Sequence, residues 1–215
     1  TGSLRLRSPG QLSTLPGYAE GGWWVHDAAA ALPAKLLQPQ PGERILDLGC
    51  GVGNSTLPWA EGFPGAEVHA VDVAAPLLRY GHARAEALGV PVHFSQQNAE
   101  RTDFAAGSFD LVVSHILLHE TSRSALPRIV AECHRLLRPG GLMLHLEIPR
   151  GSTPFQQFMY NWEVWNNNET FAVHMTGLDL AGLAVAAGFE PGKVEALDYA
   201  QRRSREQQLY SDEVN

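Results

Sequence analysis

Apolar and polar positions along the middle of the chain form two kinds of pattern, which predict strands and helices in turn. Five short apolar runs bounded by turn residues are expected to be strands. Three longer stretches between them carry apolar residues at helical spacing. The expected strands are Arg44–Leu48, Glu67–Asp72, Pro91–Ser95, Phe109–Ser114 and Leu142–Ile148, and the expected helices are Gly53–Gly62, Ala74–Leu88 and Ser124–Leu137.

This order of elements predicts the fold class. Strands that alternate with helices of such lengths form βαβ units, whose strands run parallel. We therefore predict an α/β, Rossmann-like fold: a mostly parallel sheet with helices on both faces. The last of the three helices is expected to end at the run Arg138–Gly141, which contains proline and glycine. A further strand is expected near Lys193–Tyr199, and the polar segment that follows it is poor in β-forming residues.

A glycine-rich turn follows the first expected strand. Gly49, Gly51 and Gly53 have the spacing G-x-G-x-G, with Asp47 just before them. A strand that runs into such a turn and then a helix presents backbone N–H groups to a ligand. A dinucleotide fingerprint would place its third glycine one position later, where this chain has Asn54. A carboxylate at Asp47 instead suits a ligand with positive charge, such as the ammonium of a methionine moiety.

Two more polar positions follow the next strands. Asp72 ends the second strand, where a carboxylate accepts hydrogen bonds from both hydroxyls of a ribose; carboxylates at such positions also cap helices. Asn98 and Ala99 follow the third strand. The Asn98 amide oxygen is expected to accept from an adenine amino group, and the Ala99 N–H to donate to the ring. The alternative for these two is an ordinary polar turn.

These motifs resemble those of the class I S-adenosylmethionine-dependent methyltransferases, especially enzymes of the ubiquinone and menaquinone biosynthesis type. The resemblance covers roughly residues 40–150 through D-L-G-C-G-V-G-N, V-D-V, N-A-E, S-F-D-L-V-V-S and L-R-P-G-G. It implies S-adenosylmethionine as cofactor and S-adenosylhomocysteine as product. The family more often has aspartate at position 98, and asparagine keeps the acceptor oxygen. The cofactor residues expected on this basis are Tyr18, Asp47, Gly49, Gly51, Gly53, Asn54, Asp72, Val73, Asn98, Ala99 and Ser114.

The loop after the fourth strand is where we expect the chemistry. Methyl transfer is an in-line displacement, for which positioning supplies much of the rate, and a base helps when the nucleophile is a hydroxyl or a carbon acid. His115, His119 and Glu147 are the candidate catalytic residues, because all three follow strands that end at the same edge. A histidine here is also frequent without acting as a base. The three could hold a divalent metal, but their spacing is not diagnostic, so we expect no metal.

Aromatic residues gather on either side of the predicted core and indicate where the acceptor binds. We expect a cap segment at 1–43, a cofactor-binding core at 44–150, an acceptor-pocket insertion at 151–176 and the end of the same domain at 177–215. The alternative is that the aromatic residues only pack a helical cap. The expected acceptor-binding residues are Trp23, Trp24, Trp162, Trp165 and Asn166.

Length, composition and charge limit the classes of molecule that this protein is expected to bind. With 215 residues, 44% of them hydrophobic, the chain is long enough for one domain with a substantial core. A formal net charge of −7 argues against nucleic acid and anionic membranes as partners and favours a small-molecule acceptor. The two cysteines, Cys50 and Cys133, lack zinc-ligand spacing and fit a reducing compartment. No apolar run approaches the ~20 residues of a spanning helix, so we expect a cytoplasmic protein.

Three other functions remain open at this level. A nicotinamide-dependent oxidoreductase is disfavoured by Asp47 and by the glycine spacing. A non-catalytic scaffold or regulatory subunit would have no need of the complete motif. A methyltransferase for protein or nucleic acid is disfavoured by the low positive charge and by the absence of an N-P-P-Y type loop.

Overall fold

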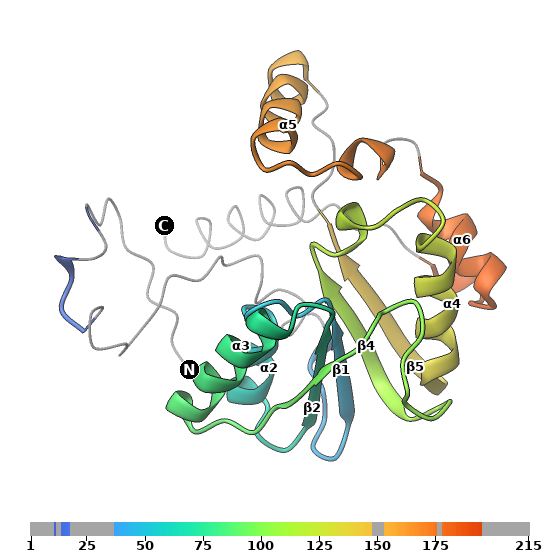
Figure 1. Ribbon diagram of the computed structural model, residues 1–215. Coiled ribbons are helices and arrows are strands. Elements are labelled where there is room, and N and C mark those ends of the chain that lie inside the picture. The colour runs from blue at the N-terminus through green and yellow to red at the C-terminus, as the bar shows by residue number, and fades with distance from the viewer. Residues whose placement is uncertain (1–10, 12–13, 18–36, 148–152, 176–177, 195–215) are drawn as a thin grey trace, which may run out of the picture.

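The fold is built on a five-stranded sheet in which every strand runs parallel to its neighbours (Figure 1). The computed structural model describes residues 11, 14–17, 37–147, 153–175 and 178–194. The strand order is β3-β2-β1-β4-β5, which confirms the predicted α/β class. The strands are β1 (Arg44–Leu48), β2 (Glu67–Asp72), β3 (His93–Gln96), β4 (Phe109–His115) and β5 (Leu137–Leu146).

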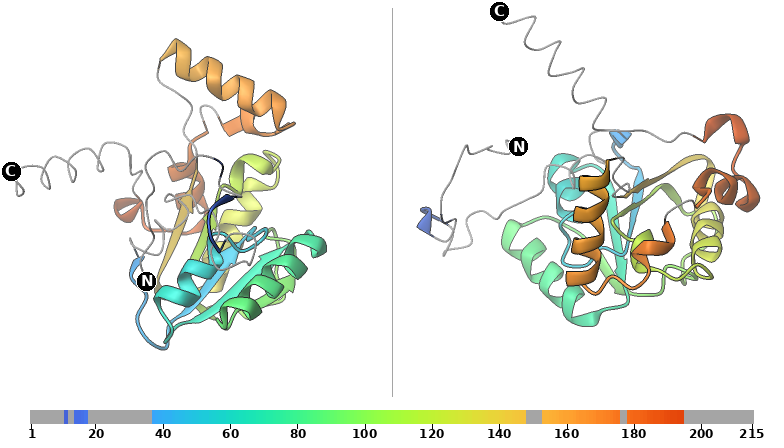
Figure 2. Two further views of the ribbon diagram at one scale, coloured as in Figure 1. Left: turned by 90° about the vertical axis from the view of Figure 1, so that its left-hand side faces the viewer. Right: turned by 90° about the horizontal axis from the view of Figure 1, so that it is seen from above.

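Helices cover both faces of the sheet, as expected. Figure 1 shows α2 and α3 on one face, and α4 with α6 on the other. Helix α5 stands beyond the carboxyl ends of the strands, and the view from above places it across that edge (Figure 2). The helices are α2 (Thr56–Gly62), α3 (Ala75–Leu88), α4 (Leu126–Leu136), α5 (Pro154–Asn166) and α6 (Leu180–Ala187), with short 3-10 turns η3 (Leu118–Glu120), η4 (Ala172–Met175) and η5 (Pro191–Lys193).

The core has one layer on each face of the sheet, because successive residues of a strand point to opposite sides. On β1, Leu46 packs in the layer that contains Ile129 and Cys133 of α4. Its neighbour Ile45 packs in the opposite layer, with Trp59 of α2. The central strand β4 is buried on both faces, as parallel strands between two helical layers must be.

The largest departure from the sequence prediction is the start of β5. The segment expected to be a turn, Arg138–Gly141, belongs to β5, which begins at Leu137 directly after α4. The pairing with β4 is irregular there: Leu137 pairs with Phe109, whereas the next pair along is Leu142 with Leu111. The extra residues are absorbed as a bulge, and an ion pair between Arg138 and Asp110 fastens the bulged segment to β4.

The bounds of the other helices and strands differ from the expected ones by only a few residues. Some expected segments lie outside the described residues. Helix α2 begins at Thr56 rather than at Gly53, because the glycine turn occupies the preceding residues. Of the strand expected near Lys193–Tyr199, Lys193 lies in η5 and residues 195–199 lie outside the described part of the chain, as do residues 18–36. Among the described residues, no helix is long and apolar enough to cross a membrane.

The packing of α2 predicts a large effect of one core substitution. Trp59 is fully buried, so Trp59→Ala should lower the free energy of unfolding by about 3–5 kcal/mol. Trp165, whose exposed fraction is 85%, provides the matched control, and Trp165→Ala should change stability by no more than about 0.5 kcal/mol. Urea denaturation followed by circular dichroism measures both, and similar losses in the two variants would contradict the assignment of the core.

Candidate cofactor-binding and catalytic site

The candidate site lies at the carboxyl ends of β1 and β4. From β1 the chain first adds β2 and β3 on one side of β1, and then returns to add β4 and β5 on the other side, so the strand order reverses between β1 and β4. Ligands of open α/β sheets bind where this reversal opens a crevice. The glycine turn after β1 is held there by the N–H groups of Gly49 and Cys50, which donate to the carbonyl of Val71 at 2.8 and 3.0 Å.

The glycines of this turn are required by its backbone conformation and by its neighbours. Gly49, Gly51 and Gly53 have φ angles of 67°, 52° and 81°, in the left-handed region that other residues rarely adopt. A Cβ on Gly49 would lie 2.5 Å from Leu117 Cδ1, in the loop after β4. A Cβ on Gly51 would meet no atom of the described residues within 4 Å. Gly49 therefore packs against the loop after β4, whereas no described residue covers the backbone at Gly51.

Asp47 is the most unusual group in the site, since its carboxylate is fully buried. The hydroxyls of Ser55 and Thr56 both donate to Oδ2, each at 2.7 Å. The other oxygen, Oδ1, is buried and has no hydrogen-bond partner among the described residues. Burial raises the pKa of Asp47 to about 6, although the two hydroxyls oppose the shift. An unpartnered carboxylate oxygen behind the glycine turn fits a ligand that carries an ammonium group.

Asp72 ends β2 with both oxygens bonded to backbone. Its Oδ2 accepts from the Gly51 N–H at 2.9 Å, and its Oδ1 from the Ala74 N–H at 2.8 Å. Each carboxylate oxygen can accept a second bond, so the group can still receive two hydroxyls. The carboxylate also ties the glycine turn to the end of β2. Beside it, Val73 is exposed over 64% of its surface, and this apolar side chain is available to cover a flat ligand.

The remaining predicted cofactor residues have intramolecular roles. Asn54 Oδ1 accepts from Arg84 of α3 at 2.8 Å. Asn98 Oδ1 accepts from the Glu100 N–H at 2.9 Å, while Ala99 is half-buried against the core. Asn98 forms a tight turn after β3, so its amide oxygen would have to leave or share this bond to reach an adenine.

Ser114 is buried at the end of β4 and pairs with a histidine of β5. Its hydroxyl lies 2.7 Å from Nδ1 of His145. Burial lowers the pKa of His145 to about 4, so the ring is neutral at physiological pH. Its Nε2 is buried without a hydrogen-bond partner in the described part of the chain. The pair stiffens the junction of β4 and β5 beneath the candidate site.

The structure brings His119 and Glu147 together. The Nδ1 of His119 lies 2.7 Å from Glu147 Oε2, and Glu147 Oε1 accepts from the Leu118 N–H at 2.7 Å. The hydrogen bond from Glu147 raises the pKa of His119 most; burial lowers it, and the charges of Glu147, Glu120 and Glu169 raise it further. With Nδ1 bonded to the carboxylate, the lone pair of the neutral ring is on Nε2.

A small cavity opens beside His119. Its volume is about 20 Å³, enough for one water molecule. It is lined by His119 and by residues of α5 and the turn after it: Tyr160, Glu163, Val164 and Glu169. The Oε1 of the exposed Glu120 lies 3.8 Å from His119 Nε2.

The loop that carries His119 is strained at its start. His115 is the last residue of β4 and is half-buried. The next residue, Ile116, has a φ of 59°, which is costly for a β-branched side chain. Its N–H donates to the carbonyl of Leu146 at 2.8 Å, so the turn is fixed to the end of β5.

Helix α5 does not turn its predicted acceptor residues towards His119. Tyr160 and Val164, four residues apart on one face, line the cavity. Trp162 and Trp165 are exposed over 54% and 85% of their surfaces, and Asn166 donates to the carbonyl of Trp162 within the same helix at 2.6 Å. Their role in binding an acceptor stays a prediction. Tyr18, Trp23 and Trp24 lie outside the described residues.

Several residues of the site were not predicted from the sequence. Ser55 and Thr56 gave a weak signal, as two hydroxyls directly after a glycine turn. The others gave none, because their position depends on how α5 and β5 pack. The unpredicted residues are Ser55, Thr56, His145, Tyr160, Glu163, Val164 and Glu169.

Comparison with known proteins gives a consistent set of similarities. The model of the methyltransferase domain family matches residues 45–141. An uncharacterized methyltransferase from Synechocystis is 33% identical over 167 residues, which are 74% of this chain and 72% of that protein. The demethylmenaquinone methyltransferase of Thermus thermophilus is 37% identical over 107 residues, which are 50% of this chain and 48% of that protein. The chain thus spans about half the length of the Thermus relative.

Solved structures show the same fold. The YcgJ protein from Bacillus subtilis aligns with a TM-score of 0.55 and 26% identity, over 64% of this chain and 57% of that one. A geranyl diphosphate methyltransferase in complex with GPP and sinefungin aligns with a TM-score of 0.51 and 29% identity, over 55% of this chain and 44% of that one.

The buried charge of Asp47 predicts a pH-dependent gain in stability when it is removed. The folded-state pKa of about 6 lies above the ordinary 3.8, so the protonated form is favoured in the folded state. Above that pH the buried charge costs roughly 3 kcal/mol. Asp47→Asn should therefore raise the free energy of unfolding by about 1–3 kcal/mol at about pH 8. The gain should shrink as the pH falls through 6 and vanish below about pH 4.

Urea denaturation of the ligand-free protein at several pH values measures this effect. The exposed Asp103 supplies a control, because Asp103→Asn should change stability by no more than about 0.5 kcal/mol at any pH. A gain for Asp47→Asn that is the same at low and high pH would contradict the buried charge as its cause.

Proposed function

The chain belongs to the class I S-adenosylmethionine-dependent methyltransferases, and on this premise we propose that it methylates a small molecule whose nucleophile is deprotonated by His119. The enzyme uses S-adenosylmethionine and releases S-adenosylhomocysteine. Its relatives are methyltransferases, so the nicotinamide-dependent and the non-catalytic alternatives are not favoured. The observation that carries the proposal is the pair formed by His119 and Glu147 at the edge of the sheet where the glycine turn lies.

The described residues suggest how the cofactor is held. We assign the unpartnered oxygen of Asp47 to the ammonium group and the open backbone at Gly51 to the carboxylate. Asp72 is assigned to the ribose hydroxyls, and Asn98 with Ala99 to the adenine. When bound, S-adenosylmethionine supplies a methyl group on a sulfonium, ready for in-line displacement. The strain at Ile116 fits this arrangement, since strained backbone is common where a loop must present groups to a ligand.

His119 is proposed as the general base. Glu147 accepts from Nδ1, so the basic Nε2 is left to accept a proton from the acceptor. As the bond between the acceptor and the methyl carbon forms, the carbon–sulfur bond breaks, and the acceptor's proton stays on Nε2. Glu147 stabilises the imidazolium that results. A base at this place suits an acceptor with a weakly acidic O–H or C–H group.

The class of acceptor is supported by the relatives and by charge. A ubiquinone biosynthesis O-methyltransferase from Ralstonia is 28% identical over 82% of this chain and 75% of that protein. With the Thermus enzyme, it supports a hydroxylated ring or quinol as acceptor. The net charge of −7 supports a small molecule rather than nucleic acid. The free, buried Cys50 and Cys133 support work in the cytoplasm.

The pair of His119 and Glu147 predicts a shift in the pH dependence of activity. The pKa of His119 is raised above its ordinary value near 6.5, so the base is protonated and inactive at low pH, and activity should rise with pH through a pKa above 6.5. Glu147→Gln removes the largest cause of the shift, so the rise should move to lower pH, with a kcat reduced by roughly 10–100-fold. His119→Gln should reduce kcat by roughly 10²–10⁴-fold at pH values above that pKa and abolish the rise with pH.

Methyl transfer to a panel of phenols, hydroxyquinones and 1,3-dicarbonyl compounds measures the profile. The pKa of His119 is read independently from the NMR shift of its ring protons, with Glu120→Gln as the control for a carboxylate that does not contact Nδ1. An unchanged His119 pKa in Glu147→Gln, or full activity of His119→Gln, would rule out this base.

A further inference from the structure

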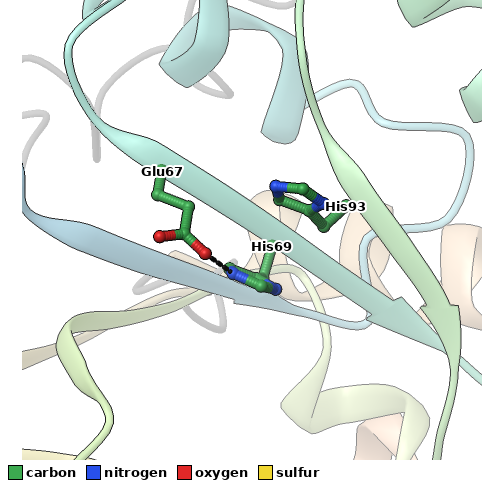
Figure 3. A group of neighbouring side chains, drawn as sticks. All are labelled: Glu67, His69 and His93. Atoms are coloured by element: carbon green, nitrogen blue, oxygen red, sulfur yellow. Dashed lines mark hydrogen bonds and ion pairs between the residues drawn. The ribbon is translucent and has the colours of Figure 1, made fainter.

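A second group of chemically active side chains lies at the opposite end of the sheet, where β2 and β3 begin (Figure 3). Glu67 and His69 are two residues apart on β2 and therefore point to the same face. His93 is the first residue of β3 and pairs directly with His69. One potential ligand atom from each of the three lies within 4.8 Å of the others.

The surroundings of His69 leave its ring partly enclosed. The edges of Phe104 and Phe109 contact it, with ring centroids 5.5 and 5.3 Å away. His93 stacks on its other side, with centroids 4.7 Å apart and ring planes at 28°. The side chain of His69 is 12% exposed, compared with 45% for Glu67. His69 is therefore packed among aromatic rings, whereas Glu67 and His93 are exposed to solvent.

The polar contacts of His69 compete with one another. Its Nε2 lies 2.6 Å from Glu67 Oε1 and 3.1 Å from Arg44 Nη2. A ring nitrogen donates a hydrogen bond or accepts one, but it cannot do both. If Nε2 accepts from Arg44, its lone pair faces the Glu67 carboxylate oxygen; if Nε2 donates to Glu67, its N–H faces the Arg44 guanidinium.

We propose that Glu67, His69 and His93 bind one divalent cation of the zinc class. Two imidazoles and a carboxylate are a ligand set that Zn²⁺ and similar ions prefer, with water in the fourth position. The cation would replace Arg44 as the positive group that contacts both His69 Nε2 and the Glu67 carboxylate. Glu67 and the exposed His93 must turn to close the site, while His69 stays in place.

Arg44 is the group that opposes a cation at this place. Its Nη1 donates to the Ser108 carbonyl at 2.7 Å, and its guanidinium lies 4.8 Å from the Phe109 ring centroid. Arg44 also forms an ion pair with Glu67, whose Oε2 lies 3.3 Å from Arg44 Nε. A bound ion would have to displace Arg44 from both Glu67 and His69, while the contacts with Ser108 and Phe109 would keep its side chain in place. Its positive charge still weakens binding of the ion. The affinity is therefore set by competition between the ion and Arg44.

The expected consequence of binding is structural. The ligands come from β2 and from β3, which is the outer strand of the described sheet. An ion held by both would fasten this strand to β2, at the end remote from the glycine turn. A ligand that binds only the folded state stabilises it, so the site predicts a rise in Tm with Zn²⁺ and no requirement for the ion in methyl transfer.

The test uses the full chain, freed of metal with a chelator. Calorimetric titration with Zn²⁺ and the visible absorption of bound Co²⁺ should both show one ion per chain, and Zn²⁺ should raise the Tm. His93→Ala should weaken Zn²⁺ binding at least tenfold and abolish the rise in Tm. His82→Ala is the matched control: this exposed histidine of α3, 3.5 Å from Glu86, should not affect binding.

Two further variants test the same site independently of His93→Ala, in case that variant does not fold. Glu67→Gln should weaken Zn²⁺ binding at least tenfold, and Arg44→Gln should strengthen it. A competing group, formed by His119, Glu120 and Glu169, is tested with Glu169→Gln. Absence of Zn²⁺ binding in a folded chain, binding unaffected by His93→Ala and Glu67→Gln, or binding lost only in Glu169→Gln would each overturn the proposal.

Discussion

The buried carboxylate of Asp47 is the constraint on which the rest of the site depends. It lies at the end of β1 without exposure to water, and burial raises its pKa to about 6. Among the described residues, only one of its oxygens has hydrogen-bond partners, the hydroxyls of Ser55 and Thr56 at the start of α2. Such a group destabilises the ligand-free fold at neutral pH. The proposed binding of a cationic ligand would account for its presence, and the cofactor site would then lower the stability of the ligand-free fold.

The reversal of strand order between β1 and β4 divides the site into two parts with different tasks. The proposed cofactor side is built from β1 and β2, through the glycine turn and Asp72, which are hydrogen-bonded to each other. The proposed proton-transfer side is built from β4 and β5, through His119 and Glu147. Leu117, which a Cβ on Gly49 would strike, lies between the two parts. The packing of one glycine thus sets how closely the two parts approach.

The sequence predicted the parts of the fold that local patterns determine. β1 and β2 begin and end where expected, and the glycine turn lies at the predicted edge. The start of β5 was predicted wrongly, because proline and glycine also occur in bulges and only pairing with β4 decides between bulge and turn. His119 and Glu147 were predicted as separate candidates; their contact required the tertiary fold. The cavity residues of α5 could not be foreseen, since its orientation depends on packing beyond the strands. The cluster around His69 depends likewise on the register of β2 and β3.

Binding of the cofactor is the measurement that tests the account most directly. Isothermal titration of the purified protein with S-adenosylmethionine, and separately with S-adenosylhomocysteine, should show saturable binding at one site per chain. Asp72→Ala should lose this binding, because both the ribose contact and the bond to Gly51 disappear. Asp103→Ala, which removes an exposed carboxylate, should retain it. Absence of heat with either ligand in a folded protein, or equal binding by Asp72→Ala, would contradict the assignment of the site.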